Sequence, residues 1–415
     1  MTNLKFIREN PDLIKEGCRK KGIIIDIDKI LKLDQERRGI IVNLENLKAE
    51  KNKISEKPNE QEIKRLKDIK IEIKKLEDNL KNLEETLSHL VGLVPNLPLP
   101  SVPEGQGEKD NVVLREWGRK PKFNFKPLDH LELGKKLDLI DFETGAKVSG
   151  SQFYYLKNEA VLLELALTRY AFDILMKEGF VPWLTPDLVH QRFYEGTGYL
   201  PRGPEAQTYE IKNTDIGLIA TAEVTLAGIH TDEILLEKDL PKKYAGFSHC
   251  FRVEAGGYGK YSRGLYRVHQ FSKVEMYVYC RPEESEKMHQ YLLSLEERIF
   301  QGLKIPYRVV EMCAGDLGAQ AARKFDLEAW MPGRGDWGEI TSTSNTTDYQ
   351  ARCLNIKYRK KDGRTEFVHT LNGTAIAISR ALIAILENYQ KKDGSVVTPK
   401  ILEKYLGIKK IEKKR

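Results

Sequence analysis

Residues 250–275 read CFRVEAGGYGKYSRGLYRVHQFSKVE, and this stretch decides the fold. Two apolar and aromatic runs flank a turn rich in glycine and arginine, which predicts an antiparallel hairpin. Side chains two residues apart on a strand project from one face, so Arg252 should point the same way as Glu254, and Arg267 the same way as Phe271. The hairpin therefore gathers a cation, a carboxylate and an aromatic ring. A nucleotide needs these three groups for its phosphate, its exocyclic amine and its base.

Two later stretches favour this nucleotide interpretation over a hairpin whose outer face is merely charged and solvated. Glu339 and Ser342 occur in the sequence EITS and bring a carboxylate and a hydroxyl near enough for a hard cation such as Mg²⁺. Residues 370–380 read TLNGTAIAISR, and an apolar helical pattern continues beyond them. Arg380 should therefore lie in the early turns of a helix and point over the sheet.

Length and composition limit the class of protein. The chain has 415 residues, of which 40% are hydrophobic, enough for a sizeable core and two or three domains. Its net charge of +7 suits a polyanionic partner without requiring one. Five scattered cysteines without a C-x-x-C pair indicate reduced thiols and no zinc ribbon. No run approaches the ~20 apolar residues of a membrane span, so we expect a cytoplasmic protein with no membrane partner.

Residues 27–92 predict a long two-helix arm that Pro58 interrupts. Apolar residues recur at alternating spacings of three and four, which is typical of a coiled-coil seam. In the second helix the seam consists of Leu66, Ile69, Ile73, Leu76, Leu80, Leu83, Leu87 and Leu90. In the first helix it consists of Ile30, Leu33, Ile40, Leu44, Leu47 and Ile54, with Arg37 and Lys51 also on the seam.

An arm of this kind is too thin to hold a pocket, at a length on the order of 45 Å. Lysine is frequent near its tip, which leaves two interpretations open. The arm is either a solvated coiled coil or a finger that contacts the phosphates of structured RNA.

A proline- and glycine-rich segment follows the arm and predicts a domain boundary near residue 108. The first domain, residues 1–108, would carry the arm. The second, residues 109–415, would be an α+β domain, with a helix over residues 159–176 and a strand over 180–184 that runs into Pro186. The sequence holds no P-loop, no G-x-G-x-x-G fingerprint, no H-E-x-x-H zinc site and no G-x-S-x-G elbow. A nucleotide would therefore have to bind on an antiparallel sheet.

Short motifs occur in a fixed order along nearly the whole chain. They include LKFIRENPD at residues 4–12, TAE at 221–223, SHCFRVEAG at 248–256, GLYRVHQFSKVE at 264–275, EITSTSN at 339–345 and LENYQ at 386–390. As an ordered set they resemble the bacterial-type seryl-tRNA synthetases, a family of class II aminoacyl-tRNA synthetases. The resemblance implies an antiparallel coiled-coil arm on a class II catalytic domain, whose mostly antiparallel sheet is flanked by helices. It also implies ATP-dependent activation of L-serine to seryl-adenylate and transfer of serine to the 3′ end of tRNA(Ser), and leaves open whether tRNA(Sec) is a second substrate.

The resemblance assigns a role to each matched residue. Arg252, Glu339 and Arg380 would be catalytic. ATP would be bound by Arg252, Val253, Glu254, Val268, Phe271, Glu339, Ile340, Thr341, Ser342 and Arg380. Within this set, Arg252 would take the α-phosphate and the serine carboxylate, Glu254 the adenine amine and Arg380 the terminal phosphate, while Phe271 would stack on adenine.

The same comparison places the amino acid and the metal. Serine would be bound by Thr221, Ala222, Glu223, Arg252, Glu275, Asn372 and Thr374. Mg²⁺, the implied cofactor, would be held by Glu339 and Ser342, and no zinc is implied. The partners would be tRNA and a second copy of the chain, which would form a homodimer through the region of Pro186.

Two departures from the family pattern stand out. Tyr258 and Tyr261 occupy a turn where the family often has small and acidic residues. Thr374 replaces a serine, which keeps the hydroxyl, adds a methyl group and should tighten the serine pocket.

Two other interpretations remain. A synthetase-like ligase could activate a small amino acid and load a carrier protein, but such relatives lack the long arm. A non-catalytic RNA-binding paralogue should have lost one of Arg252, Glu275, Glu339 or Arg380, and all four are present.

Overall fold

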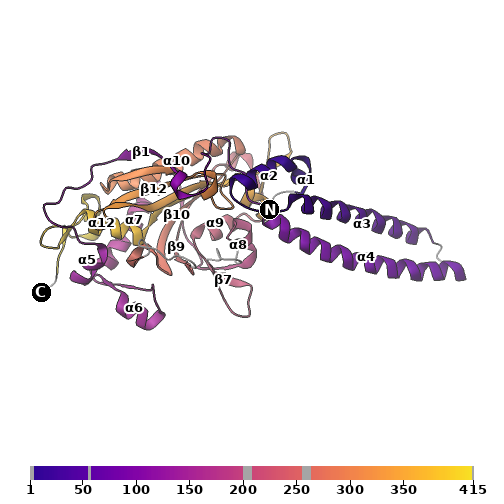
Figure 1. The fold of residues 1–415 in the computed structure, drawn as a ribbon, viewed down its shortest axis with the longest axis horizontal. Coiled ribbons are helices and arrows are strands. Elements are labelled where there is room, and N and C mark those ends of the chain that lie inside the picture. The colour runs from indigo at the N-terminus through magenta and orange to yellow at the C-terminus, as the bar shows by residue number, and fades with distance from the viewer. Residues whose placement is uncertain (1–3, 55–57, 200–207, 255–262, 414–415) are drawn as a thin grey trace. The chain divides into compact units, whose positions relative to one another are not determined.

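The computed structural model describes residues 4–54, 58–199, 208–254 and 263–413, and Figure 1 follows the chain through them. The chain divides into two compact units, Met1–Leu97 and Pro98–Arg415. The predicted boundary near residue 108 falls within the second unit, because Leu99 and Val102 pack with Val310 and Met312 of that unit.

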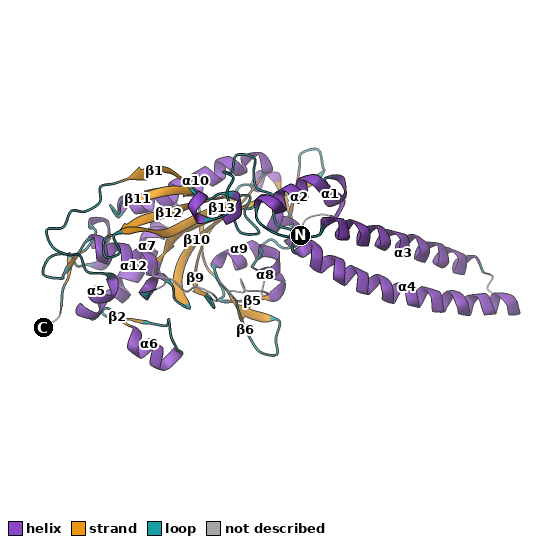
Figure 2. Ribbon diagram, in the orientation of Figure 1, coloured by secondary structure: helices purple, strands orange, loops and turns teal. Residues whose placement is uncertain are grey.

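The first unit is helical, with α1 at Leu4–Glu9, α2 at Pro11–Lys20, α3 at Ile27–Lys53 and α4 at Glu60–Gly92 (Figure 2). The long helices α3 and α4 pair with each other, which confirms the predicted arm. Each begins at a side-chain cap: Asp26 accepts from the backbone N–H of Lys29, and Asn59 forms a capping box with Glu62. The seam residues Ile30 and Leu87 join a small core with residues of α1 and α2.

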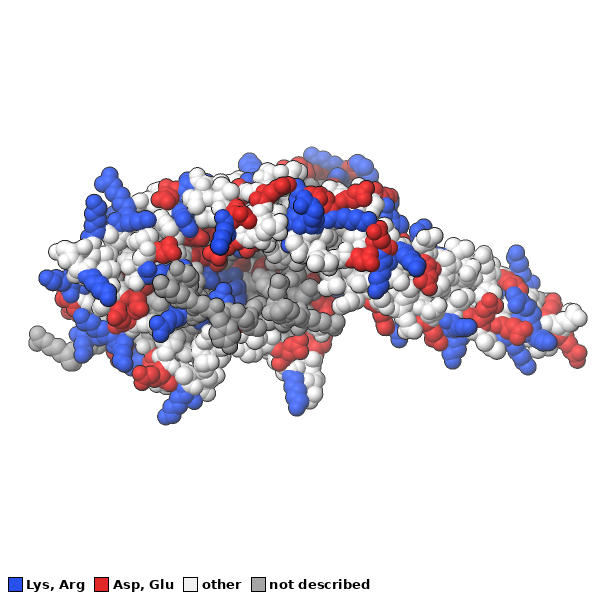
Figure 3. Space-filling model, viewed as in Figure 1, with Lys and Arg blue, Asp and Glu red and all other residues white. Residues whose placement is uncertain are grey.

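Three ion pairs connect α3 and α4 along the arm. Arg37 reaches Glu84 at 2.9 Å, Lys48 reaches Glu77 at 2.9 Å and Arg65 reaches Glu50 at 2.7 Å. Arg37, which the periodicity placed on the seam, is therefore accommodated by a partner on the opposite helix. Exposed pairs of this kind contribute about 0–1 kcal/mol each. On the face that Figure 3 shows, both charges are interspersed along the arm.

Within the described residues of the second unit, eight strands form one sheet in the order β1-β11-β12-β13-β16-β10-β9-β4. These strands are β1 Val112–Trp117, β4 Val181–Leu184, β9 Lys242–Phe251, β10 Gln270–Cys280, β11 Tyr307–Glu311, β12 Arg323–Met331, β13 Asp336–Asn345 and β16 His369–Ala377. Neighbouring strands are antiparallel except β4 and β9, which run parallel. The predicted α+β fold with a mostly antiparallel sheet is thus confirmed.

Three helices cover one face of this sheet, and the strand alternation separates the core from the other face. The helices are α7 at Glu159–Lys177, α10 at Ser285–Gly302 and α12 at Ile378–Asn388. Val274 and Met276 of β10 lie in the main hydrophobic core with residues of all three helices. The intervening residues, such as Lys273 and Glu275, therefore face the other side of the sheet.

Several shorter elements complete the second unit. The helices are α5 His130–Lys136, α6 Phe142–Ser149, α8 Gln191–Thr197, α9 Ala222–Gly228, α11 Tyr349–Leu354 and α13 Glu403–Leu406. The strands are β2 Ile140–Asp141, β3 Tyr155–Leu156, β5 Leu188–His190, β6 Tyr209–Glu210, β7 Ile216–Leu218, β8 Ile234–Leu236, β14 Lys357–Arg359, β15 Thr365–Phe367, β17 Val396–Val397 and β18 Lys410–Ile411. The 3₁₀ turns are η1 Glu108–Asp110, η2 Glu237–Asp239, η3 Gly264–Tyr266, η4 Pro282–Glu284, η5 Ala314–Asp316 and η6 Lys400–Leu402. None of the described helices has an apolar stretch long enough to cross a bilayer.

The predicted hairpin exists as β9 and β10, but its strands are shorter than expected. Arg252, Glu254 and Arg267 lie in the connection and not on the strands, so the strand alternation does not orient them. Glu254 has a φ of +51°, a left-handed conformation that no strand accommodates. The departures at Tyr258 and Tyr261 lie outside the described residues.

Candidate active site

A cavity of about 460 Å³ lies on the sheet face opposite α7, α10 and α12. Of the predicted site residues, those that line it are Glu223, Arg252, Glu254, Val268, Phe271, Glu275, Glu339, Ile340, Thr341, Ser342, Asn372, Thr374 and Arg380. Residues from β10, β13, β16, α9, α12 and the β9–β10 connection thus meet in one place. These residues lie far apart in the chain.

Three predicted residues do not line the cavity. Thr221 is fully buried and caps α9, since its hydroxyl accepts from the backbone N–H of Glu223. Ala222 packs in a second core cluster beside that helix. Val253 separates Arg252 from Glu254. Thr221 therefore contacts the backbone of Glu223 without lining the cavity itself.

Arg252 is held directly after β9 by contacts from both sides. Its backbone N–H donates to the His269 carbonyl at 3.0 Å, which continues the β9–β10 pairing by one residue. Its Nε donates to the Ala220 carbonyl at 3.4 Å, and its guanidinium lies 5.2 Å from the ring centroid of Phe271. Arg267 lies 3.5 Å from the carboxylate of Glu254. The connection therefore assembles the charges that the strands were expected to carry.

A β-bulge brings Glu339 and Ser342 to the same side of β13. Residues three apart on a regular strand face opposite ways. Here Glu328 pairs with Glu339 and Leu327 pairs with Thr341, so Ile340 is an extra residue in β13. Ile340 points into the main core, and Glu339 and Ser342 both line the cavity.

Glu339 and Arg380 form an ion pair inside the cavity, with 2.9 Å between Oε1 and Nη1. Burial alone would raise the pKa of Glu339, but Arg380 and Lys324 outweigh it and lower the pKa to about 2. The guanidinium of Arg380 also lies 4.8 Å from the ring centroid of Tyr266. The site therefore holds a permanently ionised carboxylate among cations.

The other end of the cavity is built on Glu275. Lys273, two residues earlier on β10, forms a buried ion pair with Glu275. Thr374 lies opposite Glu275 in the pairing of β16 with β10, and its hydroxyl donates to Oε2 at 3.3 Å. This end thus presents hydroxyl, ammonium and carboxylate groups, which suits a small polar ligand.

Glu223 is a deeply buried acid of the cavity, with 2% of its surface exposed. Its Oε1 accepts from Asn372 Nδ2 at 2.9 Å and from Gln350 Nε2 at 2.8 Å, and its Oε2 accepts from the Tyr199 hydroxyl at 3.0 Å. Burial, together with the nearby charge of Glu275, raises the pKa of Glu223 to about 7. Its charge therefore changes near neutral pH.

Several residues of this site were not predicted from the sequence. Lys273 could have been found, because it lies on the same strand face as Glu275. Tyr199 and Gln350 could not, because no local pattern connects them to Glu223. Tyr266 and Lys324 also line the cavity.

Oxygen donors for a hard cation are present at Glu339 and Ser342, but few in number. Among the described residues, no group of three or more His, Cys, Asp or Glu side chains could hold a metal ion. Mg²⁺ is commonly bound through one or two protein oxygens plus substrate phosphates, so the pair fits a cation that arrives with a nucleotide.

Comparisons with known proteins agree with this geometry. Residues 208–389 match the family described as tRNA synthetase class II core domain (G, H, P, S and T), and residues 1–98 match the Seryl-tRNA synthetase N-terminal domain. The sheet and cavity are thus those of a class II aminoacyl-tRNA synthetase.

Full-length relatives identify the family within that class. The serine–tRNA ligase of Dictyoglomus turgidum is 56% identical, with 100% of both chains covered, and that of Rubrobacter xylanophilus is 52% identical, with 98% of both chains covered. A crystal structure of seryl-tRNA synthetase from Pyrococcus horikoshii complexed with ATP has a TM-score of 0.91 and 43% identity over 100% of both chains. The cytoplasmic serine–tRNA ligase of Naegleria fowleri in complex with AMP has a TM-score of 0.86 and 35% identity, over 100% of this chain and 99% of that one. The chain belongs to the seryl-tRNA synthetase family, whose members are serine–tRNA ligases.

Proposed function

We propose that the cavity activates L-serine with ATP and that the resulting seryl group is transferred to the 3′ end of tRNA(Ser). The observation that carries this proposal is the presence of Arg252, Glu275 and Glu339 in one cavity. A side chain of Arg252 turned away from the two acids would have removed the basis for adenylate chemistry. We place this activity in the cytoplasm, where ATP and tRNA are available.

In the proposed activation step, a serine carboxylate oxygen attacks the α-phosphorus of ATP, and the bond to pyrophosphate breaks. Arg252 contacts both anions and spreads the charge that develops, so the residue acts by positioning and electrostatic stabilisation. Glu254 receives the adenine amine, Phe271 stacks on the base and Arg380 binds the terminal phosphate. Val268, Ile340 and Thr341 complete the nucleotide site, and Val253 connects Arg252 to Glu254.

Glu339 and Ser342 would hold Mg²⁺ together with the phosphates of ATP. The donor chemistry supports this assignment, since Glu339 stays ionised at any physiological pH. When bound, Mg²⁺ would neutralise phosphate charge. Arg380 pairs with Glu339, and both side chains line the cavity.

Serine selection is assigned to the end of the cavity around Glu275. Glu223 and Glu275 supply carboxylates, Asn372 and Thr374 close the pocket around the hydroxymethyl group, and Thr221 with Ala222 places Glu223. A site that hydrogen-bonds a substrate hydroxyl rejects alanine by roughly 10⁴-fold, because its own polar groups would be left unpaired. Threonine must instead be excluded by steric fit.

In the proposed transfer step, the 3′-OH of the terminal tRNA adenosine attacks the acyl carbon of seryl-adenylate and AMP leaves. The arm of α3 and α4 supplies an extended surface with both charges, suited to contact tRNA by shape. Charging of purified tRNA(Ser) and tRNA(Sec) with radiolabelled serine tests whether the second tRNA is also a substrate.

ATP–pyrophosphate exchange measured with each of the twenty amino acids tests the activity. We expect exchange with serine and none with alanine. Arg252→Gln should lower the exchange rate by about 10³-fold, because it removes the group that stabilises the developing charge. Arg298→Gln is the matched control. Arg298 lies on α10, pairs with Glu178 directly after the end of α7 and does not line the cavity. Exchange unaffected by Arg252→Gln would overturn the proposed mechanism.

We also propose that the protein is a homodimer in which a second copy covers the β4 edge of the sheet. All four residues of β4 are exposed, including Val181, Trp183 and Leu184. The adjacent helix α7 exposes a further apolar group, made of Val161, Leu162 and Leu165. An apolar sheet edge beside an apolar helix face is a surface that monomers avoid, which supports coverage by a partner.

A further inference from the structure

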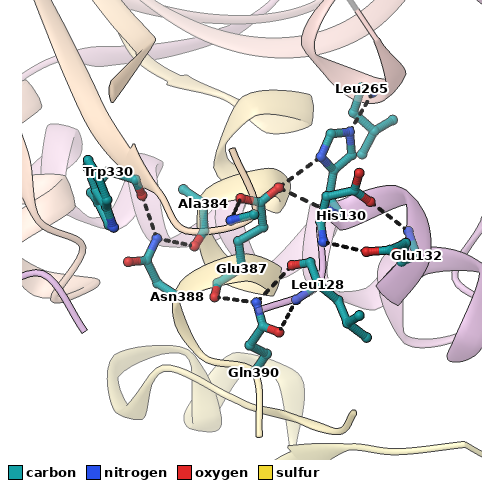
Figure 4. Close-up of polar contacts among 11 residues, drawn as sticks. Leu128, His130, Glu132, Leu265, Trp330, Ala384, Glu387, Asn388 and Gln390 are labelled. Carbon is teal, nitrogen blue, oxygen red and sulfur yellow. Dashed lines mark hydrogen bonds and ion pairs between the residues drawn. The ribbon is translucent and has the colours of Figure 1, made fainter. Parts of the chain in front are cut away.

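Glu387 and His130 form a buried polar pair that has none of the roles assigned above (Figure 4). Glu387 lies on α12, two helical turns after Arg380, and 2% of its surface is exposed. His130 is the first residue of α5, with 8% exposed. Neither residue lines the cavity.

The carboxylate of Glu387 satisfies three donors. Oε1 accepts from the backbone N–H of His130 at 3.0 Å and lies 3.0 Å from its Nδ1, and Oε2 accepts from the backbone N–H of Gly333 at 2.9 Å. The other ring nitrogen of His130, Nε2, accepts from the backbone N–H of Leu265 at 3.3 Å. Since Nε2 is an acceptor, the proton of the imidazole lies on Nδ1 and is donated to Glu387.

Both backbone groups that the pair holds lead directly into the nucleotide site. Leu265 precedes Tyr266, whose ring lies under the Arg380 guanidinium at 4.8 Å. Gly333 precedes Arg334, whose guanidinium lies 5.4 Å from the same ring. The pair is therefore connected to Tyr266 in two ways, through Leu265 next to it and through Gly333 and Arg334. Arg380 lies on the same helix as Glu387.

Gly264, the first residue of η3, packs directly against His130. A Cβ atom at Gly264 would lie 2.2 Å from His130 Nε2, and the φ of this residue is +66°. Glycine is thus required both by the backbone conformation and by the approach of His130. The position of η3 therefore depends on the position of the His130 side chain.

We propose that His130 and Glu387 are positioning residues for the nucleotide: they hold Leu265 and Gly333 so that Tyr266 and Arg380 are preorganised for ATP. The proposal rests on the proposed function, in that ATP is the nucleotide expected at Arg380. It predicts that loss of the pair weakens the binding of ATP but not that of serine, whose proposed pocket lies at the other end of the cavity.

The test compares His130→Asn with His130→Gln. Asparagine retains a donor near Nδ1 but has no acceptor near Nε2, whereas glutamine can place its amide oxygen near Nε2. Calorimetry with ATP and Mg²⁺, in the absence of serine, should show about tenfold weaker binding for H130N, because the buried N–H of Leu265 loses its acceptor. H130Q should recover most of this loss, and the KM for serine in the exchange reaction should stay at the wild-type value for both.

Asn388→Ala is the matched control on the same helix. Asn388 Nδ2 donates to the carbonyls of Trp330 and Ala384, both at 2.8 Å, and neither bond leads to Tyr266 (Figure 4). N388A should lower the unfolding temperature and leave the Kd for ATP unchanged. Gly264→Ala, which displaces η3 but keeps both members of the pair, should weaken ATP binding selectively and serves if H130N does not fold.

Wild-type affinity for ATP in folded H130N or G264A overturns the proposal, as does an equal loss in N388A. The absence of serine-dependent exchange in the wild-type chain would instead refute the proposed function. The ratio of the ATP dissociation constants still decides the role of His130 in that case.

Discussion

Glu223 is the residue whose protonation should set the pH dependence of serine use. Its pKa is raised to about 7 by burial and by Glu275. We expect the ionised carboxylate to be the form that binds serine, whose ammonium group is positively charged. We expect kcat/KM for serine to fall about tenfold for each pH unit below about 7, since this parameter reports groups of the free enzyme. The measurement is pyrophosphate exchange between pH 5.5 and 8.5.

Glu223→Gln provides the control. The variant should have low activity that no longer varies over this pH window, and a slope that persists in E223Q would contradict the assignment. The same shift predicts a stability effect of definite sign. Because the folded-state pKa lies above the ordinary value of 4.5, the contribution of Glu223 to stability is complete below about pH 4.5 and is lost as the pH rises through about 7.

Thr374 should sharpen the discrimination between serine and threonine. Its hydroxyl donates to Glu275, and its methyl group occupies space that a serine residue would leave empty. Thr374→Ser should raise kcat/KM for threonine about tenfold relative to serine, in line with the worth of one methyl group in a pocket. Exchange assays with both amino acids check this, and an unchanged ratio would refute the tighter pocket.

At the scale of the elements, repetitive patterns were predictable and irregular ones were not. The seam and Pro58 predicted α3 and α4, because a long apolar period admits few alternatives. The bulge at Ile340 had no signal in the sequence EITS, since it arises from the pairing of β13 with β12. Most of the residues that the family resemblance assigned to the site nevertheless line one cavity, because the matched motifs mark each residue individually and do not depend on local geometry.

In the hairpin, the expected placement of the charged side chains on the strands was wrong. Strand alternation was applied to Arg252, Glu254 and Arg267, all of which lie beyond the strand ends. The glycine-rich run predicted a connection between two strands but not the residues at which the strands end. Their convergence depends on contacts with Ala220 and His269 instead of a regular pleat.

Deletion of residues 34–88 tests the function of the arm as an element. The cavity is built wholly from the second unit, so serine-dependent exchange should stay near the wild-type rate. Charging of tRNA(Ser) should be abolished, because the proposed contact surface for tRNA is gone. Retained exchange reports that the catalytic unit is folded, and full charging by the shortened chain would exclude a role for the arm.

At the scale of the whole molecule, the β4 edge predicts the assembly state. Leu184 is 80% exposed, so Leu184→Asp should leave the monomer folded but place a charge in the proposed interface. Light scattering after size exclusion should give the mass of a dimer for the wild-type chain and of a monomer for L184D. Ile24→Asp is the control, because Ile24 is 100% exposed but lies far from this edge in the sequence. A wild-type monomer would rule out the dimer.

Two neighbouring strands of the sheet each contain one supernumerary residue, Ile340 in β13 and Ala375 in β16. Insertion or deletion of one codon between either bulge and the next loop would shift the strand by one residue. The polar side chains that now line the cavity would then face the hydrophobic core. These two strands can therefore tolerate some substitutions but no insertions or deletions, and natural length variation should be confined to the loops.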